Sequence, residues 1–175
     1  VEDLWGKEYY SDASSTKEIL FARRTASSST FEGYNFPVGY SSGQGGNCPT
    51  QDLVDAFECT DGKSIAESSL YDATNPYDNR DPRLKKTVVL NGEKWPNDLA
   101  DYNSEHPTIE TYTGGYHSRT GNAAGKAYAT TTGYYLKKFC NADQILRGRS
   151  GTAATTSPHG WLTFRMGGMY LNYAE

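Results

Sequence analysis

Aliphatic residues are scarce in this sequence: Leu, Ile, Val and Phe together make up about 15% of its 175 residues, below the roughly 20% that folded chains usually exceed. Disorder is not expected, however, because the net charge is only −4. Fourteen tyrosines and three tryptophans supply much of the missing apolar area. We therefore expect one domain, or part of one, with a modest core and many rings near its surface, where a ring either stacks on a ligand or pins a loop.

Basic residues are also in the minority, with 17 Lys and Arg against 21 Asp and Glu. The chain has no positive surplus with which to neutralise phosphates, so nucleic-acid binding is not expected. No stretch approaches the roughly 18 apolar residues that a membrane span requires, and no signal-peptide pattern opens the chain. The three cysteines, Cys48, Cys59 and Cys140, are too few for a disulfide framework; one bridge would be compatible with them, and the sequence does not assign it.

Short strands are predicted at three places. The apolar run 18–22 and the aromatic run 133–139 each have the length and composition of a strand. Residues 84–90 predict a third strand, which turns at Asn91-Gly92 into a return strand at 93–95.

Two helices are predicted between long loops. Residues 49–58 carry one, with Thr50 as its N-cap. Residues 166–174 have the apolar spacing of an amphipathic helix, whose apolar side docks either on its own domain or on a further part of the protein. Residues 33–46 are too rich in glycine for a regular element. The predicted fold class is α+β: a loop-rich mixture of short strands, a hairpin and a few short helices.

Four segments, in this order along residues 49–175, resemble the SusD/RagB family of outer-membrane nutrient-binding lipoproteins. They are the helical segment 49–58 followed by Asp61-Gly62, the run Asn79-Arg80-Asp81-Pro82-Arg83-Leu84, the strand segment 132–139, and the run Tyr170-Leu171-Asn172-Tyr173-Ala174-Glu175.

The resemblance implies that residues 1–175 are a fragment of the SusD-like fold, lacking the N-terminal helical-repeat part and the C-terminal end. It implies a surface-exposed lipoprotein of the outer membrane that binds oligosaccharides for uptake with a SusC-like TonB-dependent transporter. Contact with the membrane would run only through a lipid anchor outside the fragment. The family resemblance implies binding without catalysis and without a cofactor. The alternative is a region that packs against the transporter and touches no ligand.

Aromatic rings on loops are suited to binding sugars, because a sugar ring packs its C–H face on an aromatic face. Trp95, Tyr112 and Tyr116 lie on or beside the long polar stretch that follows the predicted hairpin, next to His117. These four residues are the candidate ligand-binding residues, with the pinning of loops as the alternative role. Trp161, by contrast, is predicted to be buried, as is Trp5.

The run of Asn79, Arg80, Asp81 and Arg83 places two guanidinium groups around one carboxylate. Pro82 favours an extended conformation at Asp81, so these side chains can splay apart. The run either grips a charged ligand or clamps loops that lack a large core, and we favour the structural role.

No catalytic or metal-binding residue is predicted. Residues 39–43 match the G-x-S-x-G pattern of hydrolases, but neither the preceding strand nor the following helix that this motif requires is expected there. The three histidines have no metal-ligand spacing. A glycoside hydrolase is the least favoured function, because nothing singles out a carboxylate pair.

Overall fold

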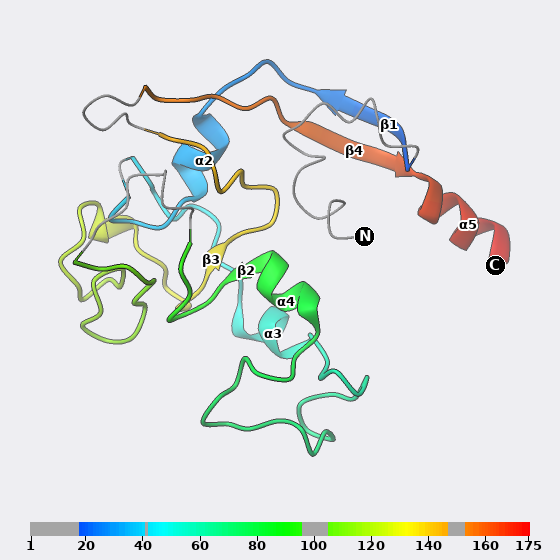
Figure 1. Ribbon diagram of the computed structural model, residues 1–175, viewed down its shortest axis with the longest axis horizontal. Helices are drawn as coiled ribbons and strands as arrows, with labels where there is room; N and C mark the ends of the chain where they lie inside the picture. Colours follow the sequence, from blue (N-terminus) through cyan, green and yellow to red (C-terminus); the bar gives the residue numbers. More distant parts are fainter. Residues whose placement is uncertain (1–17, 41, 96–104, 147–152) are drawn as a thin grey trace.

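The computed structural model describes residues 18–40, 42–95, 105–146 and 153–175. Its elements are short and separated by long loops (Figure 1), which confirms the predicted α+β class. In chain order they are β1 (Ile19–Arg24), α2 (Thr30–Asn35), α3 (Gln51–Asp55), α4 (Pro82–Thr87), β2 (Val88–Val89), the 3₁₀ helix η3 (Lys126–Tyr128), β3 (Tyr135–Leu136), β4 (Gly160–Arg165) and α5 (Met166–Ala174).

The strands form two antiparallel pairs. β1 pairs with β4, so that Phe21 faces Phe164 and Arg24 faces Gly160, and this ribbon together with α5 extends away from the loop-rich body (Figure 1). The second pair joins β2 to β3 through Val88–Leu136 and Val89–Tyr135. Both pairs connect segments that are far apart in the sequence.

The β2–β3 pair lies between two small cores. Because successive strand residues point to opposite faces, Val88 and Tyr134 enter one cluster, while Val89 and Tyr135 enter the other. Tyr135 is fully buried, and its phenol supplies apolar area that aliphatic residues would otherwise provide. The modest, aromatic-rich core expected from the composition is therefore present.

The predicted strand at 84–90 is wrong over most of its length. Asp81 caps a helix there, its side chain accepting from the N–H of Arg83, and Pro82 occupies the first helical turn. This arrangement and the helix-favouring residues that follow form α4, and only the β-branched Val88–Val89 become a strand. Residues 93–95 form no return strand, since β2 pairs instead with β3.

The other predicted elements fare better. Thr50 caps α3 by accepting from the N–H of Leu53 at 3.2 Å, and β1, β3 and α5 form where strands and a helix were predicted. Residues 33–35 are the exception, because they belong to α2. Trp161 is 43% exposed, so the prediction that it is buried is wrong, while Trp5 lies outside the described residues.

Cys48, Cys59 and Cys140 are free thiols in the structure. Among the described residues, no helix combines the length and the apolar character needed to cross a membrane.

Candidate functional site

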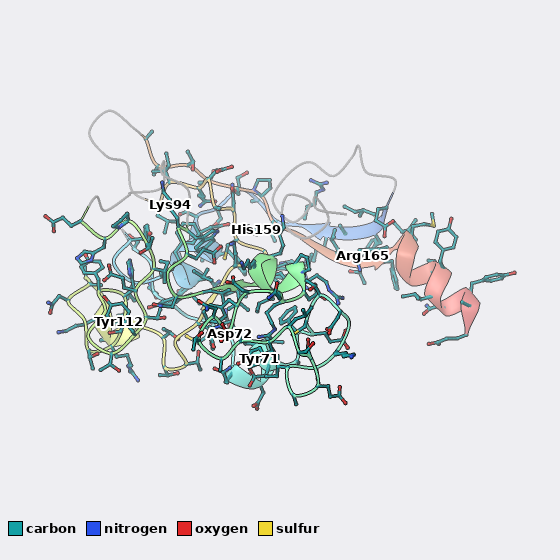
Figure 2. All side chains as sticks on the ribbon, turned by 60° about the horizontal axis from the view of Figure 1, so that its bottom comes forward. Tyr71, Asp72, Lys94, Tyr112, His159 and Arg165 are labelled. Carbon is teal, nitrogen blue, oxygen red and sulfur yellow. The ribbon has the colours of Figure 1, made fainter. Side chains whose placement is uncertain are left out.

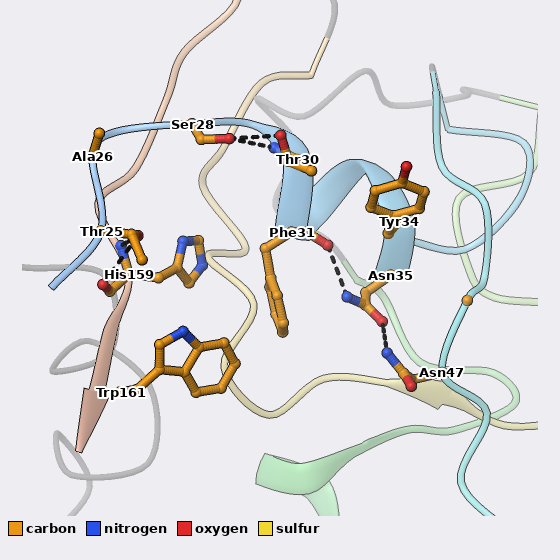
Figure 3. Close-up of a pocket in the computed structure, with 11 residues that line it drawn as sticks. Thr25, Ala26, Ser28, Thr30, Phe31, Tyr34, Asn35, Asn47, His159 and Trp161 are labelled. Atoms are coloured by element: carbon orange, nitrogen blue, oxygen red, sulfur yellow. Dashed lines mark hydrogen bonds between the residues drawn. The ribbon is translucent and has the colours of Figure 1, made fainter. Parts of the chain in front are cut away.

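An open hollow of about 560 Å³ lies between α2 and the start of β4 (Figure 3). Residues of the α2 region, the following loop and the β4 region line this α2–β4 hollow, and none of the described lining residues is an Asp, Glu, Lys or Arg. Its aromatic residues are Phe31, Tyr34, His159 and Trp161, and its polar residues are Thr25, Ser28, Thr30, Asn35 and Asn47.

Three rings gather on one side of the hollow (Figure 3). The Phe31 ring lies 4.9 Å from that of His159 and 5.8 Å, edge to face, from that of Trp161. Trp161 is 43% exposed, and Tyr34, on the next turn of α2, is 56% exposed. Two large rings thus reach solvent at the hollow, and each can offer a face to a ligand.

Amide groups form the opposite side. Asn35 donates to the Phe31 carbonyl at 2.8 Å, and its own side-chain oxygen accepts from Asn47 at 2.6 Å. These bonds fix the Asn35 amide against α2. The side-chain oxygen of Asn47 has no partner among the described residues, and it is therefore free to accept from a ligand hydroxyl.

Backbone pairing brings the two walls together, although they are more than a hundred positions apart in the sequence. The Thr25 N–H donates to the His159 carbonyl at 2.8 Å, and the His159 N–H donates to the Thr25 hydroxyl at 3.2 Å. Ser28 forms a further antiparallel bridge with Ser157. The hollow therefore depends on the β1–β4 ribbon and its continuation.

Behind the hollow, His159 contacts a buried carboxylate. Its Nε2 lies 3.0 Å from Oε1 of Glu32, which also accepts from the N–H of Asn141 at 3.0 Å. The other oxygen of Glu32 is buried without a partner among the described residues. This pair fixes the orientation of the His159 ring at the hollow.

Of the four candidate ligand-binding residues, the structure leaves one well exposed. Trp95 is 5% exposed and packs edge-on against Phe36 at 5.0 Å. Tyr116 is half-buried and stacks on His106 at 3.9 Å. Tyr112 is 58% exposed and lies among the loops at the end of the molecule away from α5 (Figure 2). Ligand contact by Tyr112 stays a prediction.

His117 is also in the interior, where it is 1% exposed. Its Nδ1 accepts from the N–H of Glu110 at 3.1 Å, and burial lowers the pKa of its imidazole to about 4. Like Trp95, it holds the loops together and offers no surface to a ligand in this structure.

The Asn79–Arg83 run is a structural junction, but its hydrogen bonds and ion pair join other groups than predicted. Arg83 pairs with Asp81, and this contact lowers the pKa of the Asp81 carboxyl. Arg80 makes no such pair: it is 6% exposed and donates to the carbonyls of Val54, Phe57 and Pro76. The prediction of two guanidiniums around one carboxylate is therefore wrong.

The first residue of the run contributes through its backbone. Asn79 has a positive φ of 54°, a conformation that Asn tolerates better than most residues, and its side chain donates to the Leu70 carbonyl at 3.2 Å. The run thus turns the chain between two loops.

Sequence reasoning missed the residues of the α2–β4 hollow. Tyr34, Asn35 and Asn47 lie in or beside the Gly-rich stretch 33–46, where an aromatic and two amides among glycines were the available signal. Trp161 directly follows His159-Gly160, and this stretch carried no signal of exposure.

The fold and the hollow define a loop-rich α+β protein with an uncharged, aromatic-lined depression on its surface. The SusD family model matches residues 2–175, and the chain belongs to this family. None of the curated proteins matches the chain.

Two solved structures from Bacteroides fragilis resemble it. One is a SusD-like protein with 24% identity and a TM-score of 0.62, and the other is a SusD-like carbohydrate binding protein with 19% identity and a TM-score of 0.55. Each match covers 99% of this chain, which spans only 34% and 31% of the respective solved chains.

Proposed function

We propose that the protein binds oligosaccharides at the α2–β4 hollow, without catalysis, as the capture step of nutrient uptake. The observation that carries this proposal is the pairing of exposed rings with amides in an uncharged hollow. Tyr34 and Trp161 can pack on the C–H faces of sugar rings, while Asn47 and the hydroxyl of Thr30 can bond to sugar hydroxyls.

Family membership supports the same function. One related solved protein is described as carbohydrate binding. The uptake role, with a TonB-dependent transporter as partner and a position on the outer membrane through a lipid anchor, extends the family resemblance to this chain.

Isothermal titration of the protein against a panel of neutral oligosaccharides tests the binding site. Replacing Trp161 or Tyr34 by Ala should weaken binding of the preferred glycan about tenfold, which corresponds to about 1.4 kcal/mol of lost stacking. Tyr173→Ala is the matched control, because this ring is 92% exposed on α5, away from the hollow.

Thermal denaturation of each variant separates loss of the ligand contact from loss of the fold. Trp161 also packs on Phe139 at 5.8 Å, so Tyr34→Ala is the cleaner variant. If no glycan binds, or if Tyr34→Ala and Trp161→Ala bind as tightly as the parent, the α2–β4 hollow is not the binding site.

A second candidate function is favoured by the exposed apolar side chains of the β1–β4 ribbon and α5. No residue of α5 is buried, and the exposed large apolar residues of this arm include Phe21, Phe164, Tyr170 and Leu171. In this role the arm packs against the transporter. Tyr170→Ala with Leu171→Ala should then reduce co-purification of the transporter and leave glycan affinity unchanged, the reverse of the pattern expected for Tyr34→Ala.

A further inference from the structure

A second hollow, of about 280 Å³, lies among the loops between residues 111 and 133. Arg119 is the only charged residue in the part of its lining that the structure describes, and the rest is mostly hydroxyl-bearing, including Thr111, Thr113, Ser118 and Thr131. We call it the Arg119 hollow. We propose that it binds an anionic substituent, a carboxylate or a sulfate, carried by a sugar unit of the ligand.

The balance of donors and acceptors supports this proposal. Arg119 donates one hydrogen bond, to the Ala127 carbonyl at 3.3 Å, and its remaining N–H groups have no partner among the described residues. The hydroxyls of Thr113 and Thr131 likewise have no partner there. A hollow with a guanidinium, free hydroxyls and no carboxylate is suited to an oxyanion, which needs donors only.

The surrounding sequence is unusual for an acidic chain. Residues 111–142 contain no Asp or Glu, although the chain as a whole carries 21. The last acid before this segment, Glu110, is engaged by the N–H of Tyr116 at 3.0 Å and by His106 at 3.1 Å. Among the described residues, the lining of the hollow thus holds no carboxylate that would repel an anion.

The walls of the hollow are held in place from beneath. Tyr135 is fully buried, and its hydroxyl donates to the His117 carbonyl at 2.7 Å and accepts from the Thr130 N–H at 3.2 Å. One phenol thus joins both walls, and the Gly114 N–H donates to the Thr120 hydroxyl at 2.8 Å to close the loop. A hollow fixed in this way needs little ordering when a ligand binds.

Matched pairs of oligosaccharides test the inference, which builds on the proposed glycan binding. One pair is an oligogalacturonide and its methyl ester, and the other is a sulfated galactose oligosaccharide and its desulfated form. The anionic member of one pair should bind about three- to tenfold more tightly, because Arg119 is exposed and its charge is partly screened. Which pair shows the difference identifies the carboxylate or the sulfate.

Variants locate the effect. Arg119→Gln should abolish the difference within the pair, and Arg119→Lys should restore part of it. Lys126→Gln, which removes a charge from the same acid-free segment outside the hollow, should leave the difference intact. Equal loss in Arg119→Gln and Lys126→Gln would show a general charge effect and overturn the site, as would equal affinity within both pairs.

Two small probes, glucuronate and inorganic sulfate, keep the inference separate from the proposed function. Each is titrated alone while the amide NMR signals of Thr113 and Thr131 are followed. Shifts that disappear in Arg119→Gln support the Arg119 hollow even if Tyr34→Ala shows that the α2–β4 hollow binds no glycan. The absence of Arg119-dependent shifts with both probes overturns the inference.

Discussion

Arg80→Ala should destabilise the protein by about 3 kcal/mol, and by up to about 5. The guanidinium is buried and donates to the Val54 carbonyl at 2.6 Å, to the Phe57 carbonyl at 2.7 Å and to the Pro76 carbonyl at 2.9 Å. Two of these carbonyls lie at the end of α3, where the helix leaves its last acceptors without intrahelical partners. Hydrogen bonds to a charged group contribute about 1.5–3 kcal/mol each, and water that enters the vacated space recovers part of the loss.

Urea unfolding, followed by tyrosine and tryptophan fluorescence, measures the effect through the shift of the midpoint. Arg80→Lys should recover only part of the loss, because an ammonium cannot reach all three carbonyls. Arg83→Ala is the matched control: the Arg83 side chain is 59% exposed, so its loss should cost less than about 1 kcal/mol. If Arg83→Ala costs as much as Arg80→Ala, the junction depends on the ion pair with Asp81 and the reasoning is wrong.

Three further predictions follow from burial. Trp95→Ala should cost about 3–5 kcal/mol in the same urea titration, and Tyr112→Ala less than about 0.5, because only Trp95 lies in the core. As the pH falls from 6.5 to about 4, the free energy of unfolding should decrease by up to about 1.4 kcal/mol per pH unit, because His117 binds a proton in the unfolded chain but not in the folded interior. Urea titrations at a series of pH values measure this slope, and His117→Gln should remove it. A thiol-reactive dye should label half-buried Cys48 before unfolding and Cys140 only afterwards, because burial raises the pKa of the Cys140 thiol, and mass spectrometry of the labelled peptides checks the order.

The sequence predicted those helices and strands that depend mainly on neighbouring residues. Thr50 caps α3 because its hydroxyl lies three residues before a free N–H, and the apolar run at 18–22 becomes part of β1. The strand at 84–90 failed because apolar β-branched residues follow an Asp-Pro helix start within the same short window. The Asp81 cap and Pro82 start a helix at the beginning of this window, and only Val88 and Val89, at its end, form a strand.

Pairing partners could not be predicted in this way. Asn91-Gly92 is a hairpin signal, but of these two residues only Gly92 adopts the positive φ, 83°, that a type I′ hairpin turn requires at both. Yet β2 pairs with β3 from more than forty positions away, because Tyr135 and Val89 share one core while Tyr134 and Val88 share the other. Tertiary burial outweighs the local turn preference.

The role of each ring depends on where its polar end finds a partner. A buried tyrosine must bond its hydroxyl, and Tyr134 and Tyr135 do so, with Gln51 at 2.8 Å and with the His117 carbonyl at 2.7 Å. Neither the hydroxyl of Tyr34 nor the indole N–H of Trp161 has a partner within the described parts of the chain, and both rings stay exposed. The partners that bury a ring come from distant segments, so the sequence shows the aromatic residues without showing which of them the fold leaves to a ligand.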